Sequence, residues 1–382
     1  MECRVGLIGL GWFAGIIARA LAEKGGGHCR LWAVCDIEPE RAREFGKRFG
    51  IDRVYRKPEE LVGDPEIDIV AIATPPHLHF ELALMAFQAG KNVFLEKPGA
   101  LRQNEMEELI KVCSEKNLKA TIDYVMRRNP LYFVLKMIND SKIFGMLERA
   151  GLENYAHDDH LLPSHWFWDS EKSGGIWLEH GVHFFDLTNW LLGRPEKVMA
   201  LNIKREGFGF VDRVMGFCVH KEGAVVDYYH GFTKPEPFEK TTFSFTFERA
   251  YAKVYGWIPV RLEIDALVTE KTDGFLRGEV TEKAQNFLPG INVKLDVEKV
   301  EEYENEKFFT GRGKTFKAAG RYTYVFFIEQ DRWEVYRACV AEGLKDLSMA
   351  ARGLKEDCDV TLYDALGALQ VALEMEKAAV KL

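Results

Sequence analysis

Apolar and polar positions follow two different rhythms along the chain, and the rhythm changes near residue 125. In the first third, short apolar runs such as residues 4–10 and 67–73 alternate with amphipathic segments, separated by Gly or Pro turns. Apolar runs that alternate with helical patterns are typical of a parallel sheet wrapped by helices. We therefore predict a doubly wound α/β domain over residues 1–125.

After residue 125 the pattern is mixed. Runs such as residues 197–204 and 211–220 alternate with a period of two, which indicates an antiparallel sheet with one face on helices. We expect two closing helices, at about residues 322–345 and 362–377. The prediction is an α+β domain over 126–382 with a mostly antiparallel open sheet, whose C-terminal helices pack back on the first domain. A second subunit would cover the other face of that sheet, so we expect a homodimer or homotetramer.

Composition and charge exclude several classes of protein. The 382 residues carry a net charge of -8, which repels phosphate backbones, so we expect no nucleic-acid partner. No run is long enough to span a bilayer. The seven cysteines form no CxxC pair, which argues against a disulfide framework or a four-cysteine zinc site. The first residues lead straight into an apolar strand without room for a signal peptide, and we expect a cytoplasmic protein.

A glycine-rich turn follows the first predicted strand. The sequence G-L-G-W-F-A over residues 9–14 fits G-x-G-x-x-[GA], and it opens a predicted helix, as a Rossmann dinucleotide site requires. Asp36 ends the second strand, where its carboxylate can bind the ribose hydroxyls and would repel a 2′-phosphate. NAD is therefore favoured over NADP. The turn residues that we expect to contact the cofactor are Gly9, Gly11, Trp12, Phe13 and Ala14.

Two further loops end parallel strands, at the sheet edge where open α/β sheets bind ligands. Thr74, Pro75 and His79 follow one strand, and Glu96 and Lys97 follow the next. We expect these residues to contact the cofactor. A lysine that lies away from bulk water beside the nicotinamide could lose its proton and then polarise or deprotonate a substrate hydroxyl. An ordinary surface pair with Glu96 is the alternative for Lys97.

These motifs together resemble the Gfo/Idh/MocA oxidoreductases. The most specific elements are A-G-K-x-V-x-x-E-K-P over residues 89–98 and G-G-x-x-x-E-x-G-x-H-x-x-D over residues 174–186. The resemblance covers about residues 3–195 and leaves residues 235–317 unplaced. It implies an NAD-binding Rossmann domain, a substrate bound between the domains, and an open sheet that forms a dimer or tetramer interface. It also implies a cis peptide bond before Pro98.

The resemblance implies roles for three side chains. Lys97 falls on the family's active-site lysine, and His183 falls on its catalytic histidine. Glu179 lies one helical turn before His183, where many members carry Asp, and would orient or acidify that histidine. Trp166 could stack on a sugar ring, although ordinary packing is its alternative. The full set of expected substrate-binding residues is Lys97, Arg128, His157, Trp166, Glu179 and His183.

Several functions remain open at this point. The first is an NAD-dependent dehydrogenase that acts on a secondary alcohol of a sugar, cyclitol or sugar acid. The second is a glycoside-cleaving enzyme of the same family that retains its NAD. A metal site made by Glu179, His183 and His157 would suit such a reaction. The third is a non-catalytic, dinucleotide-sensing regulator, against which Lys97 and His183 argue. The sequence does not name the substrate.

Overall fold

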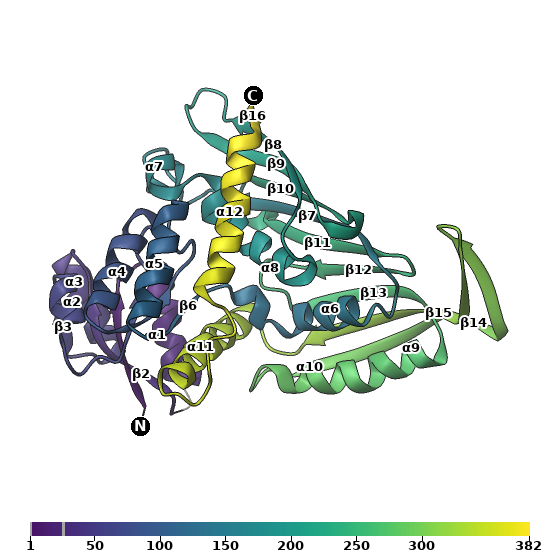
Figure 1. Cartoon of the computed structure of the whole chain (residues 1–382), viewed down its shortest axis with the longest axis horizontal. Coiled ribbons are helices and arrows are strands. Elements are labelled where there is room, and N and C mark those ends of the chain that lie inside the picture. The colour runs from purple at the N-terminus through teal and green to yellow at the C-terminus, as the bar shows by residue number, and fades with distance from the viewer. Residues whose placement is uncertain (1, 25–26) are drawn as a thin grey trace. The chain divides into compact units, whose positions relative to one another are not determined.

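The computed structural model describes residues 2–24 and 27–382 and divides into two compact units (Figure 1). The first unit comprises Met1–Val125, Pro163–Asp186 and Arg337–Glu374. The second unit comprises Met126–Leu162, Leu187–Tyr336 and Met375–Leu382. The grouping differs from a division into 1–125 and 126–382, because two segments from the later chain complete the first unit.

The first unit is built on a six-stranded parallel sheet with the order β3-β2-β1-β4-β5-β6. Its strands are β1 (Cys3–Ile8), β2 (Cys29–Cys35), β3 (Arg53–Tyr55), β4 (Ile69–Ile72), β5 (Asn92–Leu95) and β6 (Ala120–Ile122). All four residues of β4 are buried, as expected for a central strand covered on both faces. This confirms the α/β prediction for the first part of the chain.

Helices follow the strands of this sheet. They are α1 (Trp12–Lys24), α2 (Pro39–Phe49), α3 (Pro58–Val62), α4 (His79–Gln88) and α5 (Gln103–Glu115). Helix α2 shows why these boundaries fall where they do. Pro39 is favourable in its first turn, and Gly50 ends it in the left-handed conformation.

Later parts of the chain complete the same unit. Between residues 163 and 186 lie a 3₁₀ turn (Trp166–Trp168), α7 (Ser170–Ser173), a π-helical turn (Trp177–Gly181) and the start of α8 (Val182–Leu192). Most of α11 (Arg332–Ala351) and α12 (Leu362–Ala378) also belongs to this unit. Helix α11 contacts the first strands directly, because the Ser348 Oγ lies 3.2 Å from the Cys3 Sγ.

The second unit contains a ten-stranded sheet with the order β14-β15-β13-β12-β11-β7-β10-β9-β8-β16. Its strands are β7 (Leu147–His157), β8 (Lys197–Lys204), β9 (Val211–Val219), β10 (Val225–Lys234), β11 (Lys240–Phe247), β12 (Ala250–Tyr255), β13 (Arg261–Val268), β14 (Val293–Gly311), β15 (Lys314–Ile328) and β16 (Ala379–Lys381). Only the pairs β7–β10 and β8–β16 are parallel among the pairings within the described residues. The sheet is therefore mostly antiparallel, as predicted.

Helices lie along this sheet, and one hairpin extends past it. Helices α6 (Pro130–Ser141), α9 (Glu270–Phe275) and α10 (Thr281–Phe287) belong to this unit, and a π-helical turn joins α9 to α10. The Phe133 and Phe287 rings stack 4.1 Å apart and join α6 to α10. Figure 1 shows the β14–β15 hairpin (green) reaching beyond the other strands. Residues 235–317, which the sequence left unplaced, form a 3₁₀ turn, β11 to β14, α9, α10 and the start of β15.

One sequence prediction in this unit is wrong. Residues 322–328 were expected to begin a helix, but they complete β15, and α11 starts only at Arg332. The buried side chains Tyr322, Tyr324, Phe326 and Ile328 recur every second residue, which is the period of a strand. Pairing with β13 buries them on one face of the sheet.

The opposite face of this sheet exposes apolar side chains. Met199 on β8 and Met215 on β9 are about half exposed, and Arg149 pairs with Asp227 between β7 and β10 on the same face. These side chains alternate with buried ones along each strand. The role of this face in a dimer or tetramer stays a prediction.

The remaining composition predictions concern cysteines and membranes. All seven cysteines are buried and free. Within the described part of the chain, no helix is long and apolar enough to cross a membrane.

Candidate functional site

The glycine-rich turn sits between β1 and α1 at the carboxyl edge of the first sheet. Gly9 has a φ of 85°, and a Cβ there would lie 2.7 Å from Thr74 Cγ2 and 2.8 Å from the Ala73 oxygen. A Cβ on Gly11 would meet nothing within 4 Å. Gly9 is thus required by the turn itself, whereas Gly11 leaves open space before the first residue of α1. Free N–H groups at that helix start suit a pyrophosphate, so the residues present fit a dinucleotide.

Asp36 lies at the end of β2, beside this turn, and is 5% exposed. The Leu10 N–H donates to its Oδ2 and the Glu38 N–H donates to its Oδ1, each at 2.9 Å. The Arg41 Nη1, from the first turns of α2, lies 3.3 Å from both oxygens. The two main-chain donors hold the carboxylate in a fixed orientation.

His79 joins the loops that follow β4 and β5. Its Nδ1 lies 2.7 Å from the Pro98 oxygen and its Nε2 lies 2.8 Å from the Thr74 oxygen. Burial lowers the pKa of His79 to about 4, although both carbonyl contacts favour the protonated ring. His79 is 1% exposed and links the two loops, and its contact with the cofactor stays a prediction. The Lys97–Pro98 bond is cis, as the resemblance implied.

Lys97 and Glu179 form the central ion pair of the first unit. The Lys97 Nζ donates to the Glu179 Oε1 at 2.7 Å and to the Glu179 main-chain oxygen at 2.6 Å. The two side chains are only 11% and 14% exposed. Two short hydrogen bonds therefore join Lys97 to Glu179, 82 positions later in the chain. Lys97 is not the exposed partner of Glu96 that the alternative interpretation described.

The charges around Lys97 correct one expectation. Burial alone lowers the pKa of this lysine, but the carboxylates of Glu179 and Glu96 outweigh burial and raise it. Lys97 therefore keeps its proton at neutral pH. Burial raises the pKa of Glu96 well above its usual range, with Lys97 lowering it and Asp123 raising it again. Lys97 is thus a fixed positive charge and a hydrogen-bond donor, not a ready base.

His183 has the opposite tendency. Burial, the Lys97 charge and His180 together lower its pKa well below the ordinary value. The ring is 2% exposed, and the Tyr124 ring lies edge-on at 6.3 Å. A buried, neutral imidazole can accept a proton at pH 7. His183 and Lys97 are therefore a neutral base candidate and a charged donor in one unit.

The turn that carries Glu179 is not a regular α-helix. Residues Trp177–Gly181 form a π-helical turn, and α8 begins at Val182. The i, i+4 face expected for Glu179 and His183 therefore spans a change of helix type. The contact that the structure gives the Glu179 carboxylate is with Lys97. Short π-helical segments occur frequently at functional sites.

Two residues of this site escaped the sequence argument. Asp123 and Tyr124 directly follow β6, beside the end of β5 in the sheet, and both are buried. The rule that selected Lys97, a polar residue at the carboxyl end of a parallel strand, also applies to Asp123. Strand β6 ends at Ile122, so Asp123 is the first residue after it.

Other predicted site residues are distributed between the units. Trp166 lies in the first unit, with its ring 5.2 Å from that of His165. Arg128 and His157 belong to the second unit, where Arg128 is 5% exposed and the His157 Nε2 lies 3.3 Å from Glu239 Oε2. Their substrate contacts stay predictions.

The turn residues expected at the cofactor differ in exposure. Trp12 is 66% exposed. Phe13 and Pro75 are half-buried, and Ala14 is fully buried, where it allows α1 to pack closely on the strand. Within residues 2–24 and 27–382, no group of three or more His, Cys, Asp or Glu side chains is placed to hold a metal ion.

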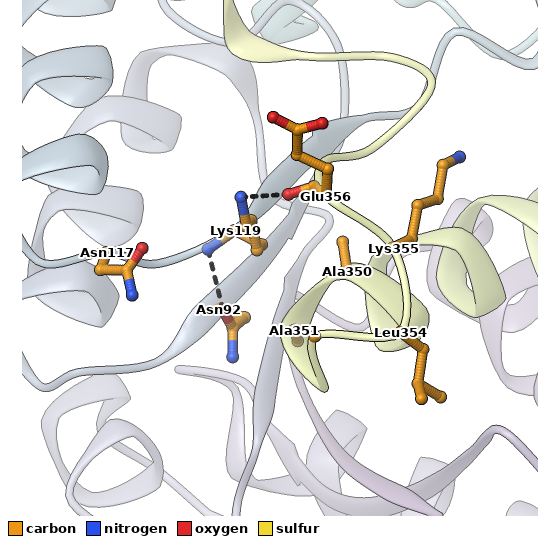
Figure 2. A pocket seen from close by; sticks show the side chains of 9 residues that line it. Asn92, Asn117, Lys119, Ala350, Ala351, Leu354, Lys355 and Glu356 are labelled. Carbon is orange, nitrogen blue, oxygen red and sulfur yellow. Dashed lines mark hydrogen bonds between the residues drawn. The ribbon is translucent and has the colours of Figure 1, made fainter.

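A hollow of about 470 Å³ lies at the other end of the first sheet. Figure 2 shows Lys119 between Asn92, which begins β5, and the loop at Glu356. The Lys119 Nζ donates to the Glu356 oxygen at 2.6 Å, so this loop already engages the charge. The hollow is at the amino ends of the strands, and it is distinct from the dinucleotide turn.

Family models match both units. One described as "Oxidoreductase family, NAD-binding Rossmann fold" matches residues 3–124, and one described as "GFO/IDH/MocA C-terminal domain" matches residues 146–253. Together they cover more than half of the chain.

Individual relatives match a smaller part. The chain is 28% identical over 224 residues to myo-inositol 2-dehydrogenase of Thermotoga maritima, which covers 58% of this chain and 64% of that protein. It is 30% identical over 171 residues to levoglucosan dehydrogenase of Pseudarthrobacter phenanthrenivorans, and the matched region covers 44% of each protein. The matched region thus spans less than two thirds of either relative.

A solved structure agrees over nearly the whole length. The WlbA dehydrogenase from Bordetella pertussis, in complex with NADH and UDP-GlcNAcA, has a TM-score of 0.76 at 19% identity and covers 99% of this chain and 95% of that one. This likeness concerns the fold. The chain belongs to the GFO/IDH/MocA family of oxidoreductases, in which the first domain is an NAD-binding Rossmann fold.

Proposed function

We propose that the protein is an NAD-dependent dehydrogenase that oxidises a secondary alcohol of a sugar, cyclitol or sugar acid, or reduces the matching ketone. One observation carries the proposal: Lys97, held protonated by Glu179 at 2.7 Å, and His183, held neutral by burial, belong to one unit. Alcohol oxidation needs a proton acceptor and a positive charge for the developing alkoxide. Relatives named as inositol and levoglucosan dehydrogenases support the substrate class.

Each side chain has a distinct task in this reaction. Bound NAD supplies the hydride acceptor. Neutral His183 takes the hydroxyl proton, and the Lys97 ammonium stabilises the negative charge on the substrate oxygen. Glu179 keeps that ammonium charged and holds it through both its carboxylate and its main-chain oxygen. In the reverse direction His183 returns the proton to the ketone oxygen.

The neighbouring carboxyl group of Glu96 has a supporting task. Burial raises the pKa of this carboxyl group, and the Lys97 charge lowers it again. Glu179 then supplies the main negative charge opposite Lys97. The catalytic set that we propose is Lys97, His183 and Glu179, with the dinucleotide held by the turn at Gly9 and Gly11 and by Asp36.

The test is NADH formation from a panel of polyols, aldoses, sugar acids and glycosides, with NAD and with NADP. Wild type is compared with Lys97→Met and with Lys111→Met, a control lysine on α5 whose side chain is 71% exposed. The NAD dissociation constant is measured for each variant by calorimetry. We expect Lys97→Met to lose turnover by at least about 100-fold with NAD binding retained, and Lys111→Met to match wild type.

The outcomes separate the competing functions. Net NADH formation that depends on Lys97 supports the dehydrogenase. Cleavage of a glycoside without net NADH, with NAD recovered from the denatured protein, would instead identify the cofactor-retaining reaction. Full turnover in Lys97→Met contradicts the assigned role of the lysine.

A further inference from the structure

Two of the buried cysteines lie side by side on neighbouring strands. Cys3 begins β1 and Cys29 begins β2, and the two residues are partners in the parallel pairing of these strands. Neighbouring strands lie about 4.8 Å apart, and partner residues point to the same face of a sheet. This spacing falls within the range of about 4.4–6.8 Å between the Cα atoms of disulfide-bonded cysteines. The backbone therefore places these two cysteines at the separation that a disulfide requires.

Contacts with α11 show that both sulfur atoms face the same helix. The Cys29 thiol donates to the Leu344 main-chain oxygen at 3.4 Å, and the Ser348 Oγ lies 3.2 Å from the Cys3 Sγ. Leu344 and Ser348 are four residues apart, so they share one face of α11. The Ser348 hydroxyl also hydrogen-bonds the Cys29 thiol. Since one hydroxyl contacts both sulfur atoms, they lie close together beneath α11.

We propose that Cys3 and Cys29 form a reversible disulfide, which links the two ends of the strand–turn–helix segment that carries the glycine-rich turn. In this reaction each thiol gives up one proton, and the pair gives up two electrons as the S–S bond forms. A small-molecule disulfide such as glutathione disulfide accepts the electrons, its own S–S bond breaks, and two glutathione thiols leave. The modification does not depend on which alcohol is the substrate.

Helix α11 controls access to this pair. Cys3 is 6% exposed and Cys29 is 2% exposed, so glutathione disulfide reaches neither sulfur atom while α11 is in place. Burial and the Cys3 sulfur raise the pKa of Cys29 to about 12, which keeps its thiol protonated and unreactive. The disulfide therefore forms when α11 opens locally, at a rate that the free energy of this opening determines.

The disulfide affects stability and leaves the dinucleotide turn in place. It closes a loop over residues 3–29, which reduces the freedom of the unfolded chain. The glycine-rich turn and Asp36 follow the opposite, carboxyl ends of β1 and β2, so the new bond does not displace them. We expect the midpoint of thermal unfolding to rise by about 5 °C, and the dissociation constant for NAD to stay within about twofold.

The experiment incubates the full chain, reduced and then freed of reductant, with glutathione disulfide at several temperatures below the unfolding midpoint. Peptide mapping by mass spectrometry identifies the linked cysteines. We expect a Cys3–Cys29 disulfide that lacks two hydrogen atoms relative to the reduced peptides, and a reductant should restore the original midpoint. Cys29→Ser should abolish the disulfide. Cys113→Ser is the matched control, because Cys113 is also buried and its thiol donates to the Leu118 oxygen at 3.3 Å.

Ser348→Ala tests the role of α11. This change removes the hydroxyl that contacts both sulfur atoms and the His28 main-chain oxygen, so α11 should open more often. We expect the disulfide to form about fivefold faster at the same temperature, which is the effect of losing one hydrogen bond from the closed state. An unchanged rate contradicts the control of access by α11.

The proposal is supported when the Cys3–Cys29 disulfide forms below the unfolding midpoint, in wild type and in Cys113→Ser, and raises that midpoint. Glutathione adducts without an internal disulfide, a different cysteine pair, or a disulfide that forms only in the globally unfolded chain overturn it. A disulfide that lowers the thermal midpoint also overturns it. If Cys29→Ser does not fold, Cys3→Ser provides the same comparison.

Discussion

The Lys97–Glu179 pair gives the sharpest prediction of stability. Glu179→Gln keeps the shape of the side chain and removes its charge, which leaves a nearly buried ammonium without its main counter-charge. At 2.7 Å and an effective dielectric constant of about 20, the pair attracts by about 6 kcal/mol before desolvation is subtracted. Desolvation cancels much of this, and Lys97 keeps its bond to the Glu179 main-chain oxygen. We expect a loss of about 3 kcal/mol in the free energy of unfolding.

Urea unfolding at pH 7 measures this loss, with Glu115→Gln as the control. Glu115 faces Lys111 at 3.9 Å on α5, with both side chains more than half exposed, and its loss should change stability by at most about 0.5 kcal/mol. The double variant Lys97→Met/Glu179→Gln should recover part of the loss, because neither charge is then left alone. If Glu179→Gln is no worse than Glu115→Gln, or if the double variant only adds the two losses, the pair is not a coupled buried pair.

Three further predictions test the rest of the first unit. His183→Asn should lower turnover by at least about 100-fold and leave the NAD dissociation constant unchanged, since the imidazole is assigned to proton transfer; equal loss of binding would contradict this. Burial lowers the pKa of His79 to about 4 and that of His180 to about 3, from an ordinary 6.5, so the unfolded chain takes up protons first as pH falls. The free energy of unfolding should thus decrease below pH 6.5, by about 2 kcal/mol per histidine at pH 5, and a flat urea profile between pH 8 and 5 would refute it. Gly9→Ala should destabilise the fold by about 2 kcal/mol, because Gly9 has a positive φ and no space for a Cβ. Gly11→Ala should fold normally and bind NAD about tenfold more weakly. Thermal unfolding and calorimetry measure the two effects, and equal effects of the two variants would contradict this prediction.

Local signals in the sequence were sufficient for much of the first unit. The buried run that became β4, the turn at Gly9 and Gly11, and Asp36 all depend on neighbours within about one strand–turn–helix unit. The sign of the Lys97 pKa could not be predicted in this way. The sequence indicated burial, which favours loss of the proton, but the deciding carboxylate lies 82 positions away.

Two other features of the structure differ from what the local pattern predicts. Spacing alone places Glu179 and His183 on one α-helical face, because nothing in the residue order marks a π-helical turn. Residues 322–328 adjoin a true helix, and their strand character depends on pairing with β13, some sixty residues earlier. For residues 322–328 the tertiary partner, not the local pattern, decides the conformation.

The contact between α11 and β1 has a consequence for biosynthesis. Ser348 reaches Cys3 across 345 positions, and Arg337 pairs with Glu23 at 2.6 Å. At about 5–20 residues per second, a ribosome completes the last of these partners tens of seconds after the first. The apolar surface of the amino-terminal strands therefore stays uncovered until α11 has been synthesised. A fragment that stops at residue 125 would retain the dinucleotide turn but lack α11, and we expect it to aggregate.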